Sequence, residues 1–155
     1  MSARPFRETR HDAGFTLLEL LIAVAVVALL VAVALPSYQE HLRKTKRAEG
    51  KAALLKAIQL EERAYTSNGQ YQTDLGPLFG LATGVVPRSG EDPTQGNYEL
   101  TAAADPANGN TLAQGVVVTA TPRSGVFSDP DCNVLTLSSV GQKTASGTKG
   151  ASFCW

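Results

Sequence analysis

One carboxylate stands inside a run of this 155-residue chain that is apolar except for that residue and Thr16. The run extends from Phe15 to Leu35, between Gly14 and Pro36, and Glu19 lies one helical turn from its start. A single carboxylate at membrane depth costs about 3 kcal/mol on insertion scales, so such a residue usually has a partner and a function. The first candidate for chemistry is therefore Glu19, as one half of a charge pair.

The two cysteines, Cys132 and Cys154, both lie in the C-terminal part of the chain. A metal site would need more ligands than this pair supplies, and the placement favours a disulfide formed in an oxidising compartment. Closing a loop of about 20 residues contributes about 3 kcal/mol of stability in the chain-entropy description. We expect the bond to hold the end of the chain to its domain.

The other reactive residue types do not assemble into a catalytic set. The chain has two histidines, His11 and His41. Neither can be combined with confidence into a Ser/His/Asp or Cys/His constellation of the kind that nucleophilic catalysis needs. We expect a protein that is not an enzyme, without a cofactor and without a metal.

Two charged segments could bind ions or nucleic acid. The Asp-Pro-Asp sequence at 129–131 offers two oxygen ligands to calcium, but a turn before Cys132 explains it without an ion. Residues 43–51 are basic, but no aromatic residue stands among them, which favours a solvated helix face or a contact between subunits over DNA. Residues 67–155, the predicted head, carry seven acidic and four basic residues. An acidic head disfavours nucleic acid as a partner.

These residues must be positioned by one long helix and a small domain. We predict a helix over residues 15–66, with an irregularity at Pro36 and an end at Asn68-Gly69. Its first half, residues 15–35, would be about 31 Å long and could cross a bilayer. Its second half, residues 36–66, is amphipathic and should pack an apolar stripe on the head. That stripe consists of Leu42, Ala48, Ala52, Leu55, Ile58 and Tyr65.

The head begins with a segment rich in glycine and proline, residues 67–96, which predicts a long loop. Residues 97–155 hold the sheet and the disulfide region. Strand-like runs are expected at 98–104, 116–121, 134–138 and 142–145, with a turn at 105–110 between the first two. The predicted fold class is α+β: a long helix packed on an antiparallel sheet of about four strands.

The N-terminal motif resembles the processing signature of type IV prepilins. It reads Gly14-Phe15-Thr16-Leu17-Leu18-Glu19 and continues into the apolar run that ends at Pro36. A secretory signal peptide or a plain signal anchor is an alternative, but signal-peptide cores span about 7–15 residues and neither alternative explains Glu19. The runs Tyr98–Thr101 and Thr119–Pro122, with the late cysteine pair and terminal Cys-Trp, are similar to minor pilins of the PilE kind.

The resemblance implies a pilin-like roll and a processed N-terminus. A prepilin peptidase would remove residues 1–14 by cutting after Gly14 and would methylate the new terminal amine of Phe15. The Glu19 carboxylate would then pair with that amine on a neighbouring subunit. Pro36 would belong with Glu19 to the segment used in assembly.

The function implied is that of a structural subunit of a type IV pilus, a minor pilin rather than a major one. Its partners would be other pilin subunits, the prepilin peptidase and the inner-membrane pilus assembly machinery. It would wait in the inner membrane as a single-pass protein with its head outward, and end in an extracellular pilus or a periplasmic filament. A type II secretion pseudopilin and a DNA-uptake pilin remain open alternatives, although the latter would need a basic head.

Overall fold

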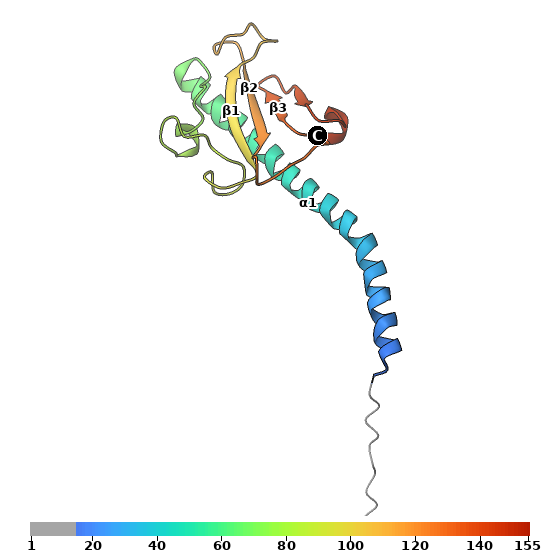
Figure 1. Ribbon diagram of the computed structural model, residues 1–155. Coiled ribbons are helices and arrows are strands. Elements are labelled where there is room, and N and C mark those ends of the chain that lie inside the picture. Colours follow the sequence, from blue (N-terminus) through green and yellow to red (C-terminus); the bar gives the residue numbers. More distant parts are fainter. Residues whose placement is uncertain (1–14) are drawn as a thin grey trace, which may run out of the picture. The chain divides into compact units, whose positions relative to one another are not determined.

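The computed structural model describes residues 15–155, so Gly14 and the rest of the predicted leader lie outside the described residues. The chain divides into two compact units, one ending at Glu40 and one from His41 to Trp155. We describe each unit by itself. Helix α1, Leu17–Asn68, contributes to both units and is assigned without a break at Pro36 (Figure 1).

The N-terminal unit exposes its apolar side chains. Thr16 caps the helix, because its Oγ1 accepts a hydrogen bond from the Glu19 amide at 3.2 Å. Every Leu, Ile and Val from Leu17 to Leu35 is exposed. Among the described residues, α1 is the one helix long and apolar enough to cross a membrane. A continuous apolar surface of this size is unfavourable in water and needs lipid or other apolar helices around it.

The C-terminal unit contains a four-stranded antiparallel sheet in the order β1-β2-β3-β4 (Figure 1). The strands are β1, Tyr98–Ala104; β2, Val116–Pro122; β3, Leu135–Ser138; and β4, Lys143–Ala145. The short helices are η1, Pro77–Phe79, in the long loop, and α2, Ala151–Cys154, near the end of the chain. The predicted α+β architecture is confirmed. The bounds of β1 are as predicted, and the other three strands each differ by one residue at one end.

Alternation along the strands gives the sheet one buried face. Leu100, Val118 and Leu135 are almost completely buried in a core that also holds Leu54 and Ala57 of α1. Intervening residues such as Thr119 are partly exposed. This inside-outside pattern is typical of an antiparallel sheet that packs one face on a helix.

The long loop closes over the outer edge of β1. The Ser89 amide donates to the Tyr98 carbonyl, and the Leu100 amide donates to the Pro87 carbonyl, both at 2.9 Å. Glu49 of α1 holds the same loop, because its Oε2 accepts a 2.7 Å hydrogen bond from the Asn97 side-chain amide. The loop is therefore hydrogen-bonded both to the edge strand of the sheet and to helix α1.

The predicted apolar stripe on α1 is wrong for four of its six residues: Leu42, Ala48, Ala52 and Leu55 are exposed, whereas Ile58 packs against the core and Tyr65 is partly buried. Leu42 is 40% exposed and Leu55 is 50% exposed. The face that packs in the C-terminal unit consists of Arg47, Gly50, Ala53, Leu54, Ala57, Glu61 and Ala64. Small residues on this face let the sheet approach the helix closely, while two charged residues interrupt its apolar pattern. Hydrophobic periodicity therefore selected the neighbouring face.

Gly50 marks the closest approach of the helix to the sheet. A Cβ at this position would lie 2.8 Å from Cε2 and 2.9 Å from Cδ2 of the Tyr98 ring. Tyr98 is fully buried, and its ring packs edge-to-face on Phe127 with centroids 5.3 Å apart. The ring has little room to retreat, so residue 50 must lack a side chain.

We expect Gly50→Ala to lower the melting temperature of the detergent-solubilised chain. Overpacking costs about 1–3 kcal/mol, whereas replacing glycine by alanine within a helix gains at most about 1 kcal/mol. The net effect on the free energy of unfolding should therefore be destabilising. Thermal unfolding followed by circular dichroism measures the net change. Ala52→Gly, at an exposed position of the same helix, is the control for helix propensity alone. An unchanged or higher melting temperature for Gly50→Ala would contradict this account of the packing.

Candidate functional site

The described residues of the predicted assembly segment lie in the N-terminal unit. Phe15 precedes α1 and is 84% exposed. Glu19 is exposed in the first turn of the helix, and Pro36 lies within the helix. Gly14, the predicted cleavage position, is outside the described residues. An exposed carboxylate one turn from Phe15 is accessible to a second chain.

The predicted disulfide is confirmed: Cys132 and Cys154 are bonded to each other. Both are fully buried and belong to the core of the C-terminal unit. Backbone hydrogen bonds run beside the bond, from the Gly147 amide to the Cys132 carbonyl at 3.0 Å and from the Lys149 amide to the Asp131 carbonyl at 2.9 Å. The end of the chain is therefore fastened to the segment before Cys132 by more than the covalent link.

A buried ion pair joins α1 to the disulfide region. Arg47 Nε donates to Asp129 Oδ2 at 2.8 Å, and Arg47 Nη2 donates to Asp129 Oδ1 at 2.9 Å. Arg47 is 4% exposed and Asp129 is 2% exposed. A bidentate pair of this kind has a defined geometry as well as energy.

This pair bears on two interpretations of the sequence. Both carboxylate oxygens of Asp129 accept hydrogen bonds from the Arg47 guanidinium. Arg47 lies in the core instead of on a solvated helix face. The basic stretch 43–51 is thus partly a structural element of the fold.

Aromatic rings do lie beside the basic stretch, although none stands within it in sequence. Lys46 Nζ is 5.1 Å from the centroid of the Phe127 ring. The guanidinium of Arg47 is 5.3 Å from the Phe153 ring, which Lys149 Nζ approaches to 5.5 Å. Such distances allow cation–π attraction.

A basic–aromatic cluster forms where α1, β4 and α2 meet. Its members are Arg47, Lys51, Lys143, Lys149, Phe153 and Trp155. Lys143 Nζ lies 5.3 Å from the Trp155 ring, and the Trp155 Nε1 donates to the Thr144 carbonyl at 2.8 Å. Trp155 is half-buried, so it both packs on the core and presents part of its ring at the surface.

Positive charges crowd one another in this cluster. Lys51 Nζ donates to the main-chain oxygen of Trp155 at 3.5 Å. Partial burial lowers the pKa of Lys51, and the charges of Arg47 and Lys143 lower it further. Cations that raise one another's free energy in this way are relieved by a bound anion.

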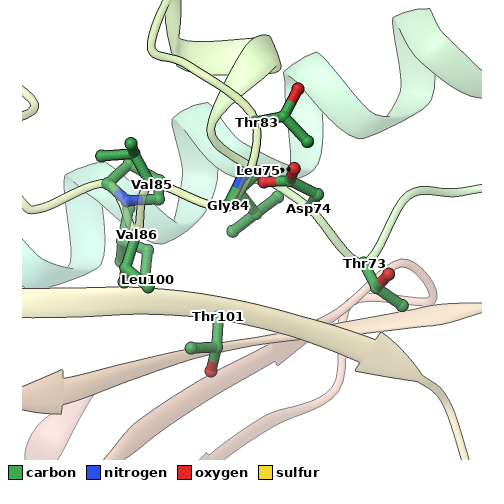
Figure 2. Close-up of a pocket in the computed structure, with 10 residues that line it drawn as sticks. Thr73, Asp74, Leu75, Thr83, Gly84, Val85, Val86, Leu100 and Thr101 are labelled. Atoms are coloured by element: carbon green, nitrogen blue, oxygen red, sulfur yellow. Dashed lines mark hydrogen bonds between the residues drawn. The ribbon is translucent and has the colours of Figure 1, made fainter.

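The hollow beside the long loop has no comparable chemistry. It has a volume of about 290 Å³ and lies between the loop and β1, with Leu75, Val86 and Leu100 in its lining. Figure 2 shows the Asp74 carboxylate turned toward the Gly84 amide. Asp74 accepts from that amide at 2.8 Å and from the Gly76 amide at 3.0 Å. It is the one ionisable residue among the ten that line the hollow, and it holds the loop.

Two sequence profiles match adjacent segments of the chain, which together span residues 9–136. The profile of the family described as "Type IV minor pilin ComP, DNA uptake sequence receptor" matches residues 36–136. The profile described as "Prokaryotic N-terminal methylation motif" matches residues 9–35. This chain belongs to the type IV pilin family.

Individual relatives agree with that assignment. Type IV major pilin protein PilA of Myxococcus xanthus strain DK1622 is 31% identical over 104 residues, which are 65% of this chain and 42% of PilA. Type IV major alpha-pilin of Moraxella bovis is 34% identical over 113 residues, or 64% of this chain and 66% of that protein. A fimbrial protein of Pseudomonas aeruginosa is 27% identical over 135 residues, or 76% and 84%. The chain thus spans less than half of the Myxococcus relative.

Among solved structures, a type IV pilin from Shewanella oneidensis aligns with 73% of this chain and 97% of that chain, at 20% identity. Its TM-score of 0.45 is too low to add to the assignment.

Family membership confirms the class expected from the sequence. The pilin is a structural protein and not an enzyme, and it carries an N-terminal methylation motif. Its apolar helix and this motif fit a membrane-anchored subunit that is assembled into a pilus. The motif also implies processing by a peptidase and other pilin subunits as partners.

Glu61 of the pilin is a buried carboxyl whose hydrogen-bond partners include no cation. Glu61 is fully buried on α1, and its Oε2 accepts a 2.8 Å hydrogen bond from the Gln72 amide. Within the described chain, Glu61 Oε1 has no hydrogen-bond partner. Burial raises the pKa of Glu61; the Gln72 amide opposes this effect and the charge of Glu62 adds to it.

We expect Glu61→Gln to flatten the pH dependence of stability. Because the folded pKa of Glu61 lies above its ordinary value of 4.5, its favourable contribution is complete below that value. The contribution is lost as the pH rises through the raised pKa, since the unfolded chain then releases the proton more readily. Glutamine stays neutral, so its advantage over glutamate should grow toward neutral pH. Urea unfolding between about pH 4 and pH 8 measures the difference in free energy of unfolding between Glu61→Gln and wild type. Glu91→Gln, at an exposed position, is the control, and equal pH profiles for wild type and Glu61→Gln would refute the assignment.

Proposed function

We propose that this pilin is a minor subunit of a type IV pilus that polymerises through the apolar half of α1 after removal of residues 1–14. The observation that carries this proposal is the exposed apolar surface from Leu17 to Leu35. Lipid covers that surface in the inner membrane, with the head outward, and neighbouring helices cover it in the filament. The family description supports a minor subunit, and the pilin and fimbrial relatives favour a pilus over a secretion pseudopilus.

Assembly needs a guide, because helices in lipid gain little hydrophobic energy by associating. Cleavage after Gly14 would leave an N-methylated ammonium on Phe15. This cation and the Glu19 carboxylate of another subunit are both costly at membrane depth, and pairing them offsets part of that cost. Pro36 removes one backbone donor from the helix interior, which gives α1 a point of local adjustment within the filament.

We expect Glu19→Ala to abolish incorporation into filaments while the C-terminal unit folds normally. Glu19 lies outside that unit, so its loss removes the intermolecular charge pair and no contact of the sheet. Surface filaments are sheared from cells, and the subunit is quantified in the sheared and membrane fractions. The variant should accumulate in the membrane with its disulfide intact.

Glu91→Ala, which removes an exposed carboxylate from the long loop, is the matched control and should enter filaments like wild type. If Glu19→Ala is incorporated equally well, charge pairing does not guide assembly.

The basic–aromatic cluster favours DNA uptake as a second role for the same subunit. The family profile that matches residues 36–136 is described as a DNA uptake sequence receptor. Lysines contact phosphates, and the exposed parts of Phe153 and Trp155 offer apolar faces beside them. Two features of the sequence disfavoured nucleic acid: the acidic net charge of residues 67–155 and the lack of an aromatic residue within the basic stretch 43–51. The fold adds Lys51 of α1 to Lys143 and Lys149.

We expect Lys143→Ala/Lys149→Ala to weaken binding of duplex DNA and to reduce its salt dependence. Each lost phosphate contact lowers the slope of log affinity against log salt by about 0.9, so the double variant should lose about 2. Fluorescence anisotropy of a labelled duplex at several salt concentrations measures both quantities. Lys56→Ala, whose ammonium lies over the Phe79 ring outside the cluster, is the control. Failure of the wild-type pilin to bind DNA, or an unchanged slope in the double variant, would reject this role.

A further inference from the structure

One side chain of α1 contacts both ends of the disulfide loop. The edge of the Arg47 guanidinium binds Asp129, three residues before Cys132. The same guanidinium lies 5.3 Å from the ring of Phe153, the residue before Cys154. Arg47 thus stands between the two chain segments that carry the cysteines, although it precedes both by more than a third of the sequence.

The contact with Asp129 extends to the backbone of the first cysteine. Asp129 Oδ1, which accepts from Arg47, also accepts from the Cys132 amide at 3.3 Å. The Asp129 carbonyl accepts from the Asn133 amide at 2.6 Å. Fixing the Asp129 carboxylate on the helix therefore fixes the turn that presents Cys132.

The two residues that flank the second cysteine, Phe153 and Trp155, both contact side chains of α1. Phe153 lies against Arg47, and the main-chain oxygen of Trp155 accepts from Lys51 Nζ at 3.5 Å. Arg47 and Lys51 are one helical turn apart on α1, so their side chains project from the same side of the helix. Cys154 sits between two residues that α1 contacts, and its Sγ lies 3.7 Å from the Asp131 carbonyl.

We propose that Arg47, paired with Asp129 and assisted by Lys51, is a positioning residue for disulfide formation: it aligns Cys132 and Cys154 on α1 before their thiols are oxidised. Oxidation requires an external disulfide such as oxidised glutathione. One cysteine thiolate attacks it, forms a mixed disulfide and releases one thiol. The second thiolate then attacks the mixed disulfide, closes the Cys132–Cys154 bond and releases the other thiol. The external disulfide is reduced as the two cysteines are oxidised.

If the Arg47 contacts favour the disulfide, the disulfide must favour the Arg47 contacts by the same factor, because coupling between two equilibria is reciprocal. If Arg47 holds the cysteines together, its loss lowers the equilibrium constant for forming the disulfide in protein that stays folded. A residue that only stabilised the fold would leave this constant unchanged. Lysine cannot replace arginine here, because an ammonium does not offer the two parallel donors that Asp129 binds.

The test measures that constant in the full-length, detergent-solubilised pilin. The protein is equilibrated in buffers of reduced and oxidised glutathione, quenched with acid, and labelled with a maleimide polymer that separates thiol and disulfide forms on a gel. Arg47→Lys, Arg47→Met and Asp129→Asn should each lower the constant by about 5-fold to 150-fold, the usual range of coupling between sites. Lys46→Met should leave it unchanged, because Lys46 contacts Phe127 instead of the cysteine segments.

A closed cycle supplies a second readout. The change in the disulfide constant must equal the difference between the costs of Arg47→Met to folding in the oxidised and reduced proteins. Wild-type constants in Arg47→Met and Asp129→Asn would overturn the proposal. If these variants fail to fold when reduced, Phe153→Ala decides the matter, because Phe153 is 47% exposed and its removal spares the core. A reduced constant for Phe153→Ala supports the proposal, and an unchanged one rejects it.

Discussion

Helix α1 must satisfy two environments with one continuous backbone. From Leu17 to Leu35 its apolar side chains are all exposed and require lipid or neighbouring helices. From His41 onward the sheet packs on the same helix. There the small residues Gly50, Ala53 and Ala57 allow the sheet to approach the helix backbone closely. The two requirements conflict on composition, since the first is met by large branched residues and the second by small ones. The chain resolves the conflict by placing them in separate units.

Two ionisable groups on the packed face show how the helix is aligned on the sheet. Buried Arg47 is neutralised by the Asp129 carboxylate, and the Glu61 carboxyl accepts a hydrogen bond from the Gln72 amide. Breaking a buried charge pair leaves an uncompensated charge, which is far costlier than losing an apolar contact. Rotation of α1 by one residue would separate both groups from their partners. The apolar contacts alone would tolerate such a shift more readily.

The elements that local pattern controls were predictable, and the contacts between distant segments were not. Alternation located β1 at its observed bounds, and the scarcity of cysteines identified the disulfide partners. The packed face of α1 was missed because small residues carry little hydrophobic signal. The Arg47–Asp129 pair joins positions 82 residues apart, and no local spacing reports it. The basic–aromatic cluster was missed for the same reason, since Phe153 and Trp155 reach the basic stretch only through folding.

Both edges of the sheet are engaged by the chain itself. Backbone groups of Tyr98 and Leu100 on β1 bond to the long loop, and the Thr144 carbonyl on β4 accepts from the Trp155 indole. Open strand edges readily pair with strands of another molecule, which leads to aggregation. By occupying these backbone groups, the loop and Trp155 leave fewer open strand groups through which one sheet could pair with the sheet of another copy.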